Sequence, residues 1–342
     1  MKKLLTFVSA ITAGAIGTAS ADVSVSGSSN FFYASGTGDA NSITNEESMS
    51  VVGGTLAFAM STETSNGVSV SSSITVSANT DSVVTASNEG PGLGGMESIV
   101  FGMDGMTVTL GDINNAGSGT GEGGDVTSFA SVNAERLATA AANGAAANDS
   151  AMDGIADGTG INVSTSIGAA SVDLTFVSKV GSGRNSLATT AKTTGYNSGY
   201  AVNVGFDMSG IAVNVAMGGS QAQVAGVEND SATALELSYP VSDALTFSAG
   251  GSSGKRGGAD EDNSFVTAAY TMDADTTLSL GFASGDNTAS SVLDKKATTS
   301  VNITRSLGGG VSVFAEYASV DNDAAAVSSS GTSLAVGTVV SF

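Results

Sequence analysis

The stretch Ile211-Ala212-Val213-Asn214-Val215-Ala216-Met217 alternates an apolar residue with a small or polar one at every step. Val172-Asp173-Leu174-Thr175-Phe176 and Thr277-Leu278-Ser279-Leu280-Gly281-Phe282 follow the same period of two. Successive side chains of a β-strand point to opposite faces of the sheet. Each stretch therefore predicts a strand with one apolar face and one face of small, polar side chains.

The same alternation recurs along most of the chain and predicts sixteen antiparallel strands. An even number of strands suits a closed barrel of one chain with both termini on the same side of a membrane. The expected strands span residues 23–34, 48–62, 67–78, 96–103, 106–112, 160–167, 170–179, 199–207, 210–219, 231–239, 244–252, 263–272, 276–284, 297–307, 311–320 and 332–342.

The expected connections alternate between short turns and long loops, which is the pattern of a membrane barrel. The short ones hold Gly, Asn, Asp and Ser and lie at 65–67, 104–105, 207–210, 240–243, 273–275 and 308–310. The long ones lie at 79–95, 113–159, 180–198, 220–230, 253–262, 285–296 and 321–331. Both prolines, Pro91 and Pro240, are expected in connections, where they interrupt no ladder hydrogen bond.

The two strand faces differ in a way that indicates their surroundings. Aliphatic residues recur on one face, whereas the other carries Ser, Thr, Asn, Gly and Ala, which are too small and polar for a dry core. After the N-terminal region, no stretch approaches the ~20 consecutive apolar residues of a membrane-spanning helix. A closed barrel pairs every backbone group, so it is stable in hydrocarbon. The sequence predicts an all-β transmembrane barrel around a column of water.

The first residues have the features of a secretory leader. Two lysines precede a mostly apolar run from Leu4 to Thr18, and Ala19-Ser20-Ala21 supplies small residues for cleavage. We therefore expect a signal peptide at 1–21 and one barrel domain at 22–342. Loss of the two lysines makes the net charge of −21 more negative by two. This charge disfavours nucleic acid as a partner and favours cations.

The chain has few of the residues that catalytic and cofactor-binding sites commonly use. It contains neither Cys nor His, which excludes Ser-His, Cys-His and the common zinc sites. The glycine-rich piece 117–121 lacks the Lys and the following helix of a phosphate loop. We expect no enzyme and no cofactor. Two acidic triplets, Asp260-Glu261-Asp262 and Asp321-Asn322-Asp323, are expected to be solvated loop tips; the alternative is that their carboxylate and amide oxygens bind Ca²⁺.

Aromatic residues fall near both ends of the expected strands, as in the girdles of membrane barrels. Those near the short turns are Phe58, Phe101, Phe206, Tyr239, Tyr270 and Phe342, and those near the long loops are Tyr33, Phe176, Tyr200, Phe282 and Tyr317. Three further phenylalanines have the opposite parity and would need bulges to reach the same face: Phe32, Phe265 and Phe314. The terminal Phe342 continues the apolar face of the last strand, which looks like the C-terminal assembly signal of outer-membrane barrels.

The segment Ile99–Asp112, IVFGMDGMTVTLGD, resembles the hairpin before the third loop of Gram-negative general porins of the α-proteobacterial type. Together with the leader and the terminal strand, the resemblance covers the whole architecture. It implies a homotrimer in the cell outer membrane of a Gram-negative bacterium and a third loop folded into the barrel. Outer-membrane lipid, lipopolysaccharide and the barrel-assembly machinery are the partners expected of such a protein.

Porins of this kind oppose acidic loop residues with a cluster of arginines on the barrel wall, and this sequence departs from that pattern. Its arginines are Arg136, Arg184, Arg256 and Arg305, and Arg305 has outward parity. The arginine cluster of these porins therefore cannot be matched to residues of this sequence.

The long connection at 113–159 is the expected constriction loop, because long connections in compact folds are usually functional or disordered. An apolar stripe on a short helix, Val126, Phe129, Val132 and Leu137, would anchor it to the inner wall; a mobile surface loop is the alternative. Carboxylates in a pore favour cations. The candidates for constriction and selectivity are Glu122, Asp125, Glu135, Asp149, Asp153 and Asp157 on the loop, with Asp173, Glu236 and Glu316 at inward parity.

Small residues interrupt the apolar outer face of the first three strands and of the last one. They are Gly27, Ser29, Gly54, Ser72 and Thr338. Contact with another protein surface explains such gaps better than contact with acyl chains. We therefore expect these strands in the interface of the trimer.

The sequence as a whole predicts an outer-membrane porin that forms a water-filled, cation-preferring channel for passive diffusion of small hydrophilic solutes and ions. Two alternatives stay open. A substrate-selective channel would need a binding track that the sequence does not reveal. The other is a secreted β-rich surface adhesin. Regular repeats of roughly 20–30 residues would support it, and the sequence has none.

Overall fold

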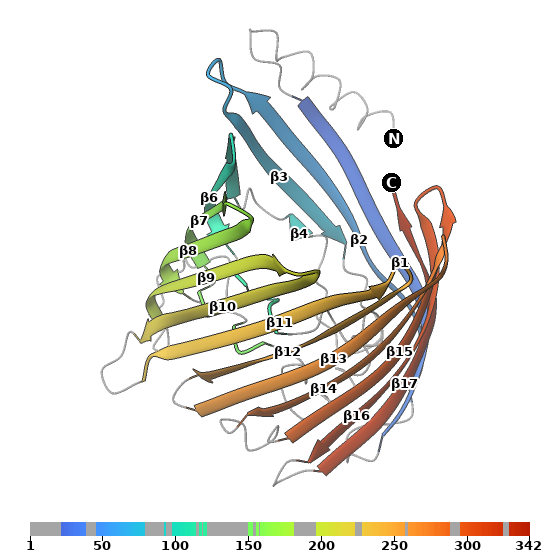
Figure 1. Cartoon of the computed structure of the whole chain (residues 1–342). Coiled ribbons are helices and arrows are strands. Elements are labelled where there is room, and N and C mark those ends of the chain that lie inside the picture. The colour runs from blue at the N-terminus through green and yellow to red at the C-terminus, as the bar shows by residue number, and fades with distance from the viewer. Residues whose placement is uncertain are drawn as a thin grey trace.

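The computed structural model describes residues 22–38, 46–78, 92–93, 98–113, 116–117, 119–121, 150–152, 155–156, 158–180, 196–222, 228–256, 259–287, 295–323 and 328–342. All regular secondary structure in these residues is β-strand (Figure 1). None of these residues belongs to a helix of the length and apolar character needed to cross a membrane. The predicted signal peptide at 1–21 lies outside them and stays a prediction.

Seventeen strands form one sheet in the described part of the chain. They are β1 (Asp22–Gly38), β2 (Glu46–Glu63), β3 (Ser69–Ala78), β4 (Gly92–Leu93), β5 (Ser98–Met103), β6 (Met106–Ile113), β7 (Gly158–Ile167), β8 (Ala170–Val180), β9 (Tyr196–Met208), β10 (Ile211–Ala222), β11 (Asp230–Ser242), β12 (Leu245–Arg256), β13 (Ala259–Asp273), β14 (Thr276–Asn287), β15 (Lys295–Gly308), β16 (Val311–Asp323) and β17 (Ser328–Ser341).

The sheet closes on itself because β1 pairs antiparallel with both β2 and β17. The other strands follow in chain order around the barrel. The two residues of β4 pair with Val76 and Ser77 of β3, while β5 pairs with Ser69–Ser72 of the same strand. Because β4 extends the line of β5, the wall is a closed barrel of sixteen antiparallel strands, as the alternation predicted.

The strands run further at their long-loop ends than the apolar pattern indicated. β12 reaches Arg256 and β13 starts at Ala259, so the long connection expected at 253–262 was wrong. Pairing simply continues between polar residues, with Lys255 opposite Asp260. Backbone groups need partners whatever side chains they carry, so the apolar pattern marks the belt of the barrel and not the strand ends.

Pro240 lies within β11 and not in a connection. It is opposite Thr246, after which the register shifts and places Ser242 opposite Leu245. A bulge tolerates proline because the ladder is already interrupted there. The prediction for Pro240 was therefore wrong, and Pro91 lies outside the described residues.

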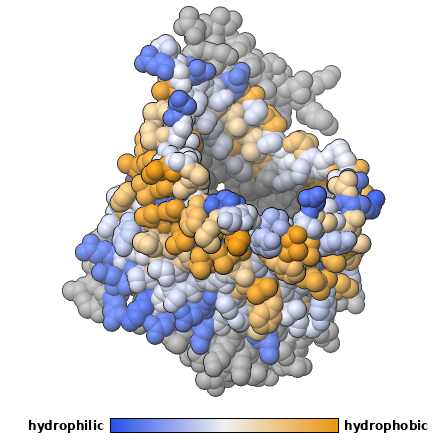
Figure 2. Space-filling model, viewed as in Figure 1, coloured by the Kyte–Doolittle hydropathy of each residue, from blue (hydrophilic) through white to orange (hydrophobic). Residues whose placement is uncertain are grey.

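The outer face of the wall is apolar. On β11, Leu235 and Leu237 are 44% and 38% exposed, whereas Ala232 and Ala234 on the opposite face are 4% and 5% exposed. Figure 2 shows the apolar residues gathered in a belt, with hydrophilic residues toward the rims. The predicted girdle residues that are exposed on this face are Phe206, Tyr239, Tyr270 and Phe342 near the short turns, and Phe176, Tyr200, Phe282 and Tyr317 near the long loops. An apolar exterior bordered by aromatic rings suits a bilayer.

Phe265 and Phe314 face the interior and are 2% and 5% exposed. The register around both is regular, so the bulges expected for them were wrong. A Cβ added to Gly250 would lie 2.8 Å from Cε1 of Phe265, which shows that this ring covers a glycine of β12. Gly337 of β17 is opposite Phe314. An aromatic ring beside a glycine supplies the contact that the glycine lacks.

Several short turns need left-handed backbone. Ser209 and Gly210 have φ angles of 59° and 86°, as a two-residue hairpin turn requires. Gly310 has a φ of 79°, and its carbonyl oxygen accepts a 2.7 Å hydrogen bond from the backbone N–H of Ser341 on β17. A Cβ on Gly310 would collide with the carbonyl oxygen of Ser341. This turn therefore requires glycine for two reasons.

We predict that Gly310→Ala destabilises the folded barrel more than Gly105→Ala. Both glycines have positive φ, and alanine costs about 1–2 kcal/mol in that conformation. A Cβ on Gly105 meets nothing within 4 Å, whereas Gly310→Ala also displaces Ser341 and loses roughly 1 kcal/mol with its hydrogen bond. Urea unfolding of the refolded protein in lipid vesicles measures the difference. Equal losses for the two variants would contradict the collision.

Candidate functional site

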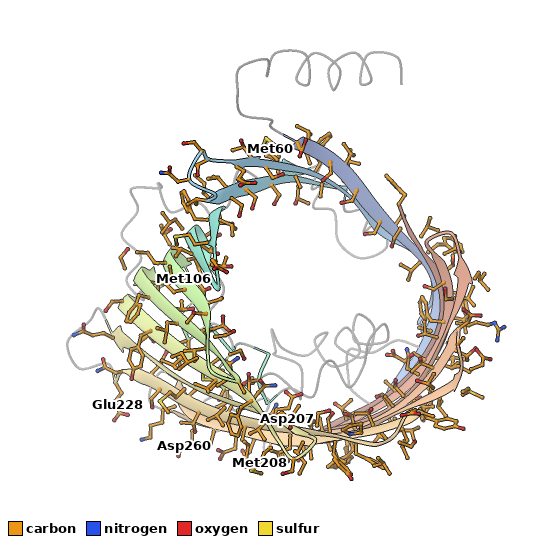
Figure 3. The ribbon with its side chains drawn as sticks, turned by 45° about the horizontal axis from the view of Figure 1, so that its top comes forward. Met60, Met106, Asp207, Met208, Glu228 and Asp260 are labelled. Carbon is orange, nitrogen blue, oxygen red and sulfur yellow. The ribbon has the colours of Figure 1, made fainter. Side chains whose placement is uncertain are left out.

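The inner face of the wall is polar, and the charged side chains that the structure describes on it are acidic. Asp173 on β8, Glu236 on β11 and Glu316 on β16 lie on this face, and Figure 3 shows the strands as a ring around it. The described basic side chains, Lys255 and Arg305, lie on the outer face in exposed ion pairs. The outward position expected for Arg305 is therefore observed. Among the charged side chains that the structure describes, the acidic residues Asp173 and Glu236 therefore face the interior, whereas Lys255 and Arg305 face outward.

Glu316 is held within a hydrogen-bonded row along the inner wall. The side-chain Nδ2 of Asn302 on β15 donates to Oε2 of Glu316 at 2.8 Å. Oγ1 of Thr304 donates to Oδ1 of the same asparagine at 2.9 Å. Glu316 is 1% exposed, and a buried carboxylate costs free energy unless it is paired. The carboxylate of Glu316 thus has a structural role that the sequence pattern did not indicate.

We predict that Asn302→Ala lowers the free energy of unfolding by about 1.5–3 kcal/mol, because the carboxylate of Glu316 loses a charge-assisted hydrogen bond. Thr304→Val serves as the control, since it removes a hydroxyl from the same row but leaves the bond between Asn302 and Glu316. Its expected loss is smaller, about 1 kcal/mol. Urea titration of vesicle-inserted protein measures both. Similar losses would show that the carboxylate gains no special stability from Asn302.

The connection between β6 and β7 begins along the inner wall. Residues 116–117 and 119–121, called the first leg here, contact β8 at one end and β11 at the other. The backbone N–H of Ala116 donates to Oγ1 of Thr175 at 2.9 Å. The backbone N–H of Gly121 donates to Oε2 of Glu236 at 3.4 Å. The first leg thus crosses the inner face of several strands, and one of its partners is a predicted selectivity residue.

The same connection returns along the inner wall. Residues 150–152 and 155–156 form the second leg, where the backbone N–H of Ala151 donates to Oγ of Ser252 on β12 at 2.8 Å. Met152 and Ile155 are 0% and 3% exposed. A Cβ on Gly218 of β10 would lie 2.8 Å from Cγ2 of Ile155 and 3.3 Å from Cε of Met152. The absence of a side chain at Gly218 therefore makes room for the apolar side chains of the second leg.

The two legs are joined to each other. Oγ of Ser150 donates to the carbonyl oxygen of Thr120 at 2.7 Å and accepts from the backbone N–H of Met152 at 3.1 Å. Small buried wall residues lie beneath the legs: Ala201, Ala216, Ala232 and Ala234. The sequence pattern identified such residues only as a water-facing surface. It could not show that some of them are covered by another part of the chain.

Six of the predicted site residues lie outside the described residues: Glu122, Asp125, Glu135, Asp149, Asp153 and Asp157. The apolar stripe of Val126, Phe129, Val132 and Leu137 lies outside them as well. Residues that the sequence analysis missed are Thr175, Ser252 and Ser150, which bind the two legs. The hydroxyl groups of all three and the inward parity of Thr175 and Ser252 were visible in the sequence, but many other Ser and Thr residues share these features.

The acidic triplets are not loop tips. Residues 260–262 belong to β13 and residues 321–323 to β16. In β13 the side chains of Asp260 and Asp262 are exposed, whereas that of Glu261 is on the opposite face and 7% exposed. Within the described residues, no group of three or more acidic side chains is arranged to hold a metal ion. The loop-tip reading was wrong because strand pairing extends beyond the apolar belt.

The last residue of the chain closes the barrel. The backbone N–H of Phe342 donates to the carbonyl oxygen of Gly27 at 3.0 Å, and the N–H of Gly27 donates back at 2.9 Å. The side chain of Phe342 is 75% exposed on the outside. The terminal residue therefore completes the pairing of β17 with β1, and its role as an assembly signal stays a prediction.

A closed antiparallel barrel with an apolar outer belt and a polar interior defines the class of outer-membrane channels. The chain belongs to the Gram-negative porin family, whose sequence pattern matches residues 6–325. No protein of curated function matches the sequence. The family and the fold together identify the protein as an outer-membrane channel, which favours the channel over the adhesin alternative.

Solved structures agree on the fold. A porin refined at 1.8 Å resolution has a TM-score of 0.61 and 15% identity, over 94% of this chain and 100% of the other. OmpF of Salmonella typhi, in complex with daunomycin, has a TM-score of 0.68 and 10% identity, over 94% and 97%. The outer-membrane channel DcaP of Acinetobacter baumannii has a TM-score of 0.62 and 11% identity, over 94% and 97%. At these identities the likeness concerns the fold alone.

Proposed function

We propose that the protein is a general diffusion porin: a water-filled channel for small hydrophilic solutes and ions that prefers cations. The observation that carries this proposal is the charge of the described inner wall. Asp173 and Glu236 are partly exposed to the lumen, and the described basic side chains point outward. Carboxylates along a narrow aqueous path raise the local concentration of cations and lower that of anions.

The carboxylates differ in how much they contribute to the field in the lumen. Glu316 is 1% exposed and hydrogen-bonded to Asn302, so its charge is partly neutralised by the wall. Glu236 accepts one hydrogen bond from the first leg and remains partly exposed. Asp173 is also partly exposed. We therefore assign the largest share of cation preference on the wall to Asp173 and Glu236.

The connection at 113–159 is proposed as the constriction loop. Contacts of its two legs with the inner face of β8 to β12 support this proposal. Legs in this position would reduce the open cross-section of the barrel. Apolar packing of Met152 and Ile155 against the wall supports a fixed position for the legs. A narrowed lumen places passing ions closer to the wall carboxylates, which strengthens their effect on selectivity.

Planar-bilayer recording in a KCl gradient tests the proposal. We predict a reversal potential of cation-preferring sign for the natural chain, and a shift toward zero in Asp173→Asn and Glu236→Gln. Asp243→Asn is the matched control, because this exposed carboxylate lies in a turn at the rim. It should leave the reversal potential nearly unchanged. An anion-preferring reversal potential in the natural chain would overturn the proposed selectivity, and absence of conductance from folded protein would overturn the channel itself.

We further propose that the protein is a homotrimer with β1, β2, β3 and β17 in the interface. Oγ of Ser72 donates to the carbonyl oxygen of Ser98 at 2.7 Å, and Oγ1 of Thr338 donates to that of Ser312 at 2.9 Å. Both hydroxyls are therefore satisfied by the barrel's own backbone. The small side chains leave a smooth outer surface without large protrusions, on which another subunit packs more closely than acyl chains do.

We predict that Ser72→Arg abolishes the trimer, because it places a charge in a tightly packed apolar interface. Thr233→Arg, on the outer face of β11, is the control and should remain trimeric. Crosslinking and light scattering in detergent measure the oligomeric state. A stable trimer in Ser72→Arg would place the interface elsewhere, and a monomeric natural chain would contradict the proposed homotrimer.

The remaining partners belong to the same proposal. Lipopolysaccharide would contact the outer rim, and the assembly machinery would recognise the exposed terminal Phe342. Ca²⁺ at residues 260–262 would involve at most Asp260 and Asp262 from β13, because Glu261 points the other way.

A further inference from the structure

The two legs are attached to the wall by hydroxyl groups as well as by apolar contact. Oγ1 of Thr175 accepts from Ala116 at the start of the first leg, and Oγ of Ser252 accepts from Ala151 in the second leg. Oγ of Ser150 joins the second leg to the first through the carbonyl oxygen of Thr120. These three hydroxyls, the hydroxyl clamp, act on both legs.

Thr175 is the best-supported member of the clamp. It is 0% exposed, and its Oγ1 accepts from the backbone N–H of Ala116 at 2.9 Å and from Nδ2 of Asn162 at 3.0 Å. Oγ of Ser164 donates to the same asparagine at 3.2 Å. Loss of this hydroxyl would remove one buried and one partly buried hydrogen bond, which costs more than the loss of a single exposed one. Thr175 is thus connected to a polar row on β7 as well as to the leg.

Ser150 and Ser252 fix the other side of the clamp. Both are buried, at 0% and 6% exposure. The hydroxyl of Ser150 donates one hydrogen bond to the first leg and accepts another from within the second leg, so it acts as both donor and acceptor. Ser252 supplies the direct bond to the wall. The backbone of the second leg is therefore held both to the first leg and to β12.

Apolar packing alone would not define where the legs lie. Contacts of Met152 and Ile155 with Gly218 are non-directional, so they tolerate a small displacement of the legs better than a hydrogen bond does. Hydrogen bonds depend on distance and angle and are lost after a shift of about 1 Å. The hydroxyls therefore add a directional constraint to the apolar packing of the legs.

We propose that Thr175, Ser252 and Ser150 are positioning residues that hold the two legs at one place on the inner wall and so determine a steady open cross-section of the channel. This inference rests on the proposed function of the legs as a narrowing of the lumen. The three residues act through the legs and carry no charge. Their removal should therefore change the steadiness and size of the current but not its ion selectivity.

Single-channel recording of Thr175→Val, Thr175→Ser and Thr304→Val tests the clamp. Valine keeps the shape of threonine and removes the hydroxyl, serine keeps the hydroxyl, and Thr304 lies on the inner face of β15 with its hydroxyl bonded to Asn302. We expect a several-fold rise in open-channel current noise and additional conductance levels in Thr175→Val. The noise should return to the natural level in Thr175→Ser and stay there in Thr304→Val, with an unchanged reversal potential in all three.

A chemical measurement keeps the test decisive if conductance is hard to interpret. The chain has no Cys, so Ala116→Cys introduces a single thiol at a position that is 6% exposed. Labelling of this thiol by a small methanethiosulfonate reagent should be slow in the natural background and many-fold faster when combined with Thr175→Val. Combination with Thr304→Val should leave the rate unchanged. Heat-modified migration on gels confirms that each variant is folded.

The outcomes separate the clamp from the channel. Equal noise and equal labelling rates in Thr175→Val and Thr304→Val would overturn the hydroxyl clamp while leaving a working channel. Faster labelling in Thr175→Val without conductance from any folded variant, the natural chain included, would support the clamp and overturn the proposed function. A shift of reversal potential in Thr175→Val would show that Thr175 acts on ions and not through the legs.

Discussion

The whole structure depends on the pairing of backbone groups in a medium that offers no water. Each unpaired N–H or C=O in hydrocarbon costs several kcal/mol, so the sheet has no free edge. Closure occurs where β1 meets β17, down to the last residue, with Phe342 bonded to Gly27. Because closure fixes the ring of strands, it also fixes which alternate residues face lipid and which face the lumen.

Closure has a second consequence, because the inner wall of so large a barrel does not fill its own interior. The described interior is instead lined by small and hydroxyl-bearing side chains, and two legs of one connection lie on part of it. Gly218 accommodates the apolar side chains of the second leg. Thr175 accepts a hydrogen bond from the backbone of the first leg, and Ser252 accepts one from the backbone of the second leg. The small residues thus serve two purposes: they leave room for water in one region and for the chain in another.

Much of the fold was predictable from the period-two alternation of apolar residues and from the residue types in the turns. The wrong predictions arose where pairing between strands, and not the local pattern, decided the structure. The alternation identified sixteen strands, and glycine with positive φ occurs in predicted turns such as that at Gly105. The pattern failed at strand ends, as at residues 253–262, and at Pro240, because pairing continues without apolar side chains. It also failed to explain Phe265 and Phe314, since their partners, Gly250 and Gly337, come from neighbouring strands.

The amino-acid sequence by itself determined the barrel class, the lipid and lumen faces and the inward parity of Asp173, Glu236 and Glu316, because each follows from residue type and a period of two. The tertiary structure alone decided which carboxylates are covered and which polar groups bind the legs. Glu316 and Asp173 share inward parity, yet Asn302 pairs with the buried Glu316 while Asp173 keeps partial exposure. Such differences arise from contacts between residues distant in the chain, as between Ala116 and Thr175, and no local pattern encodes them.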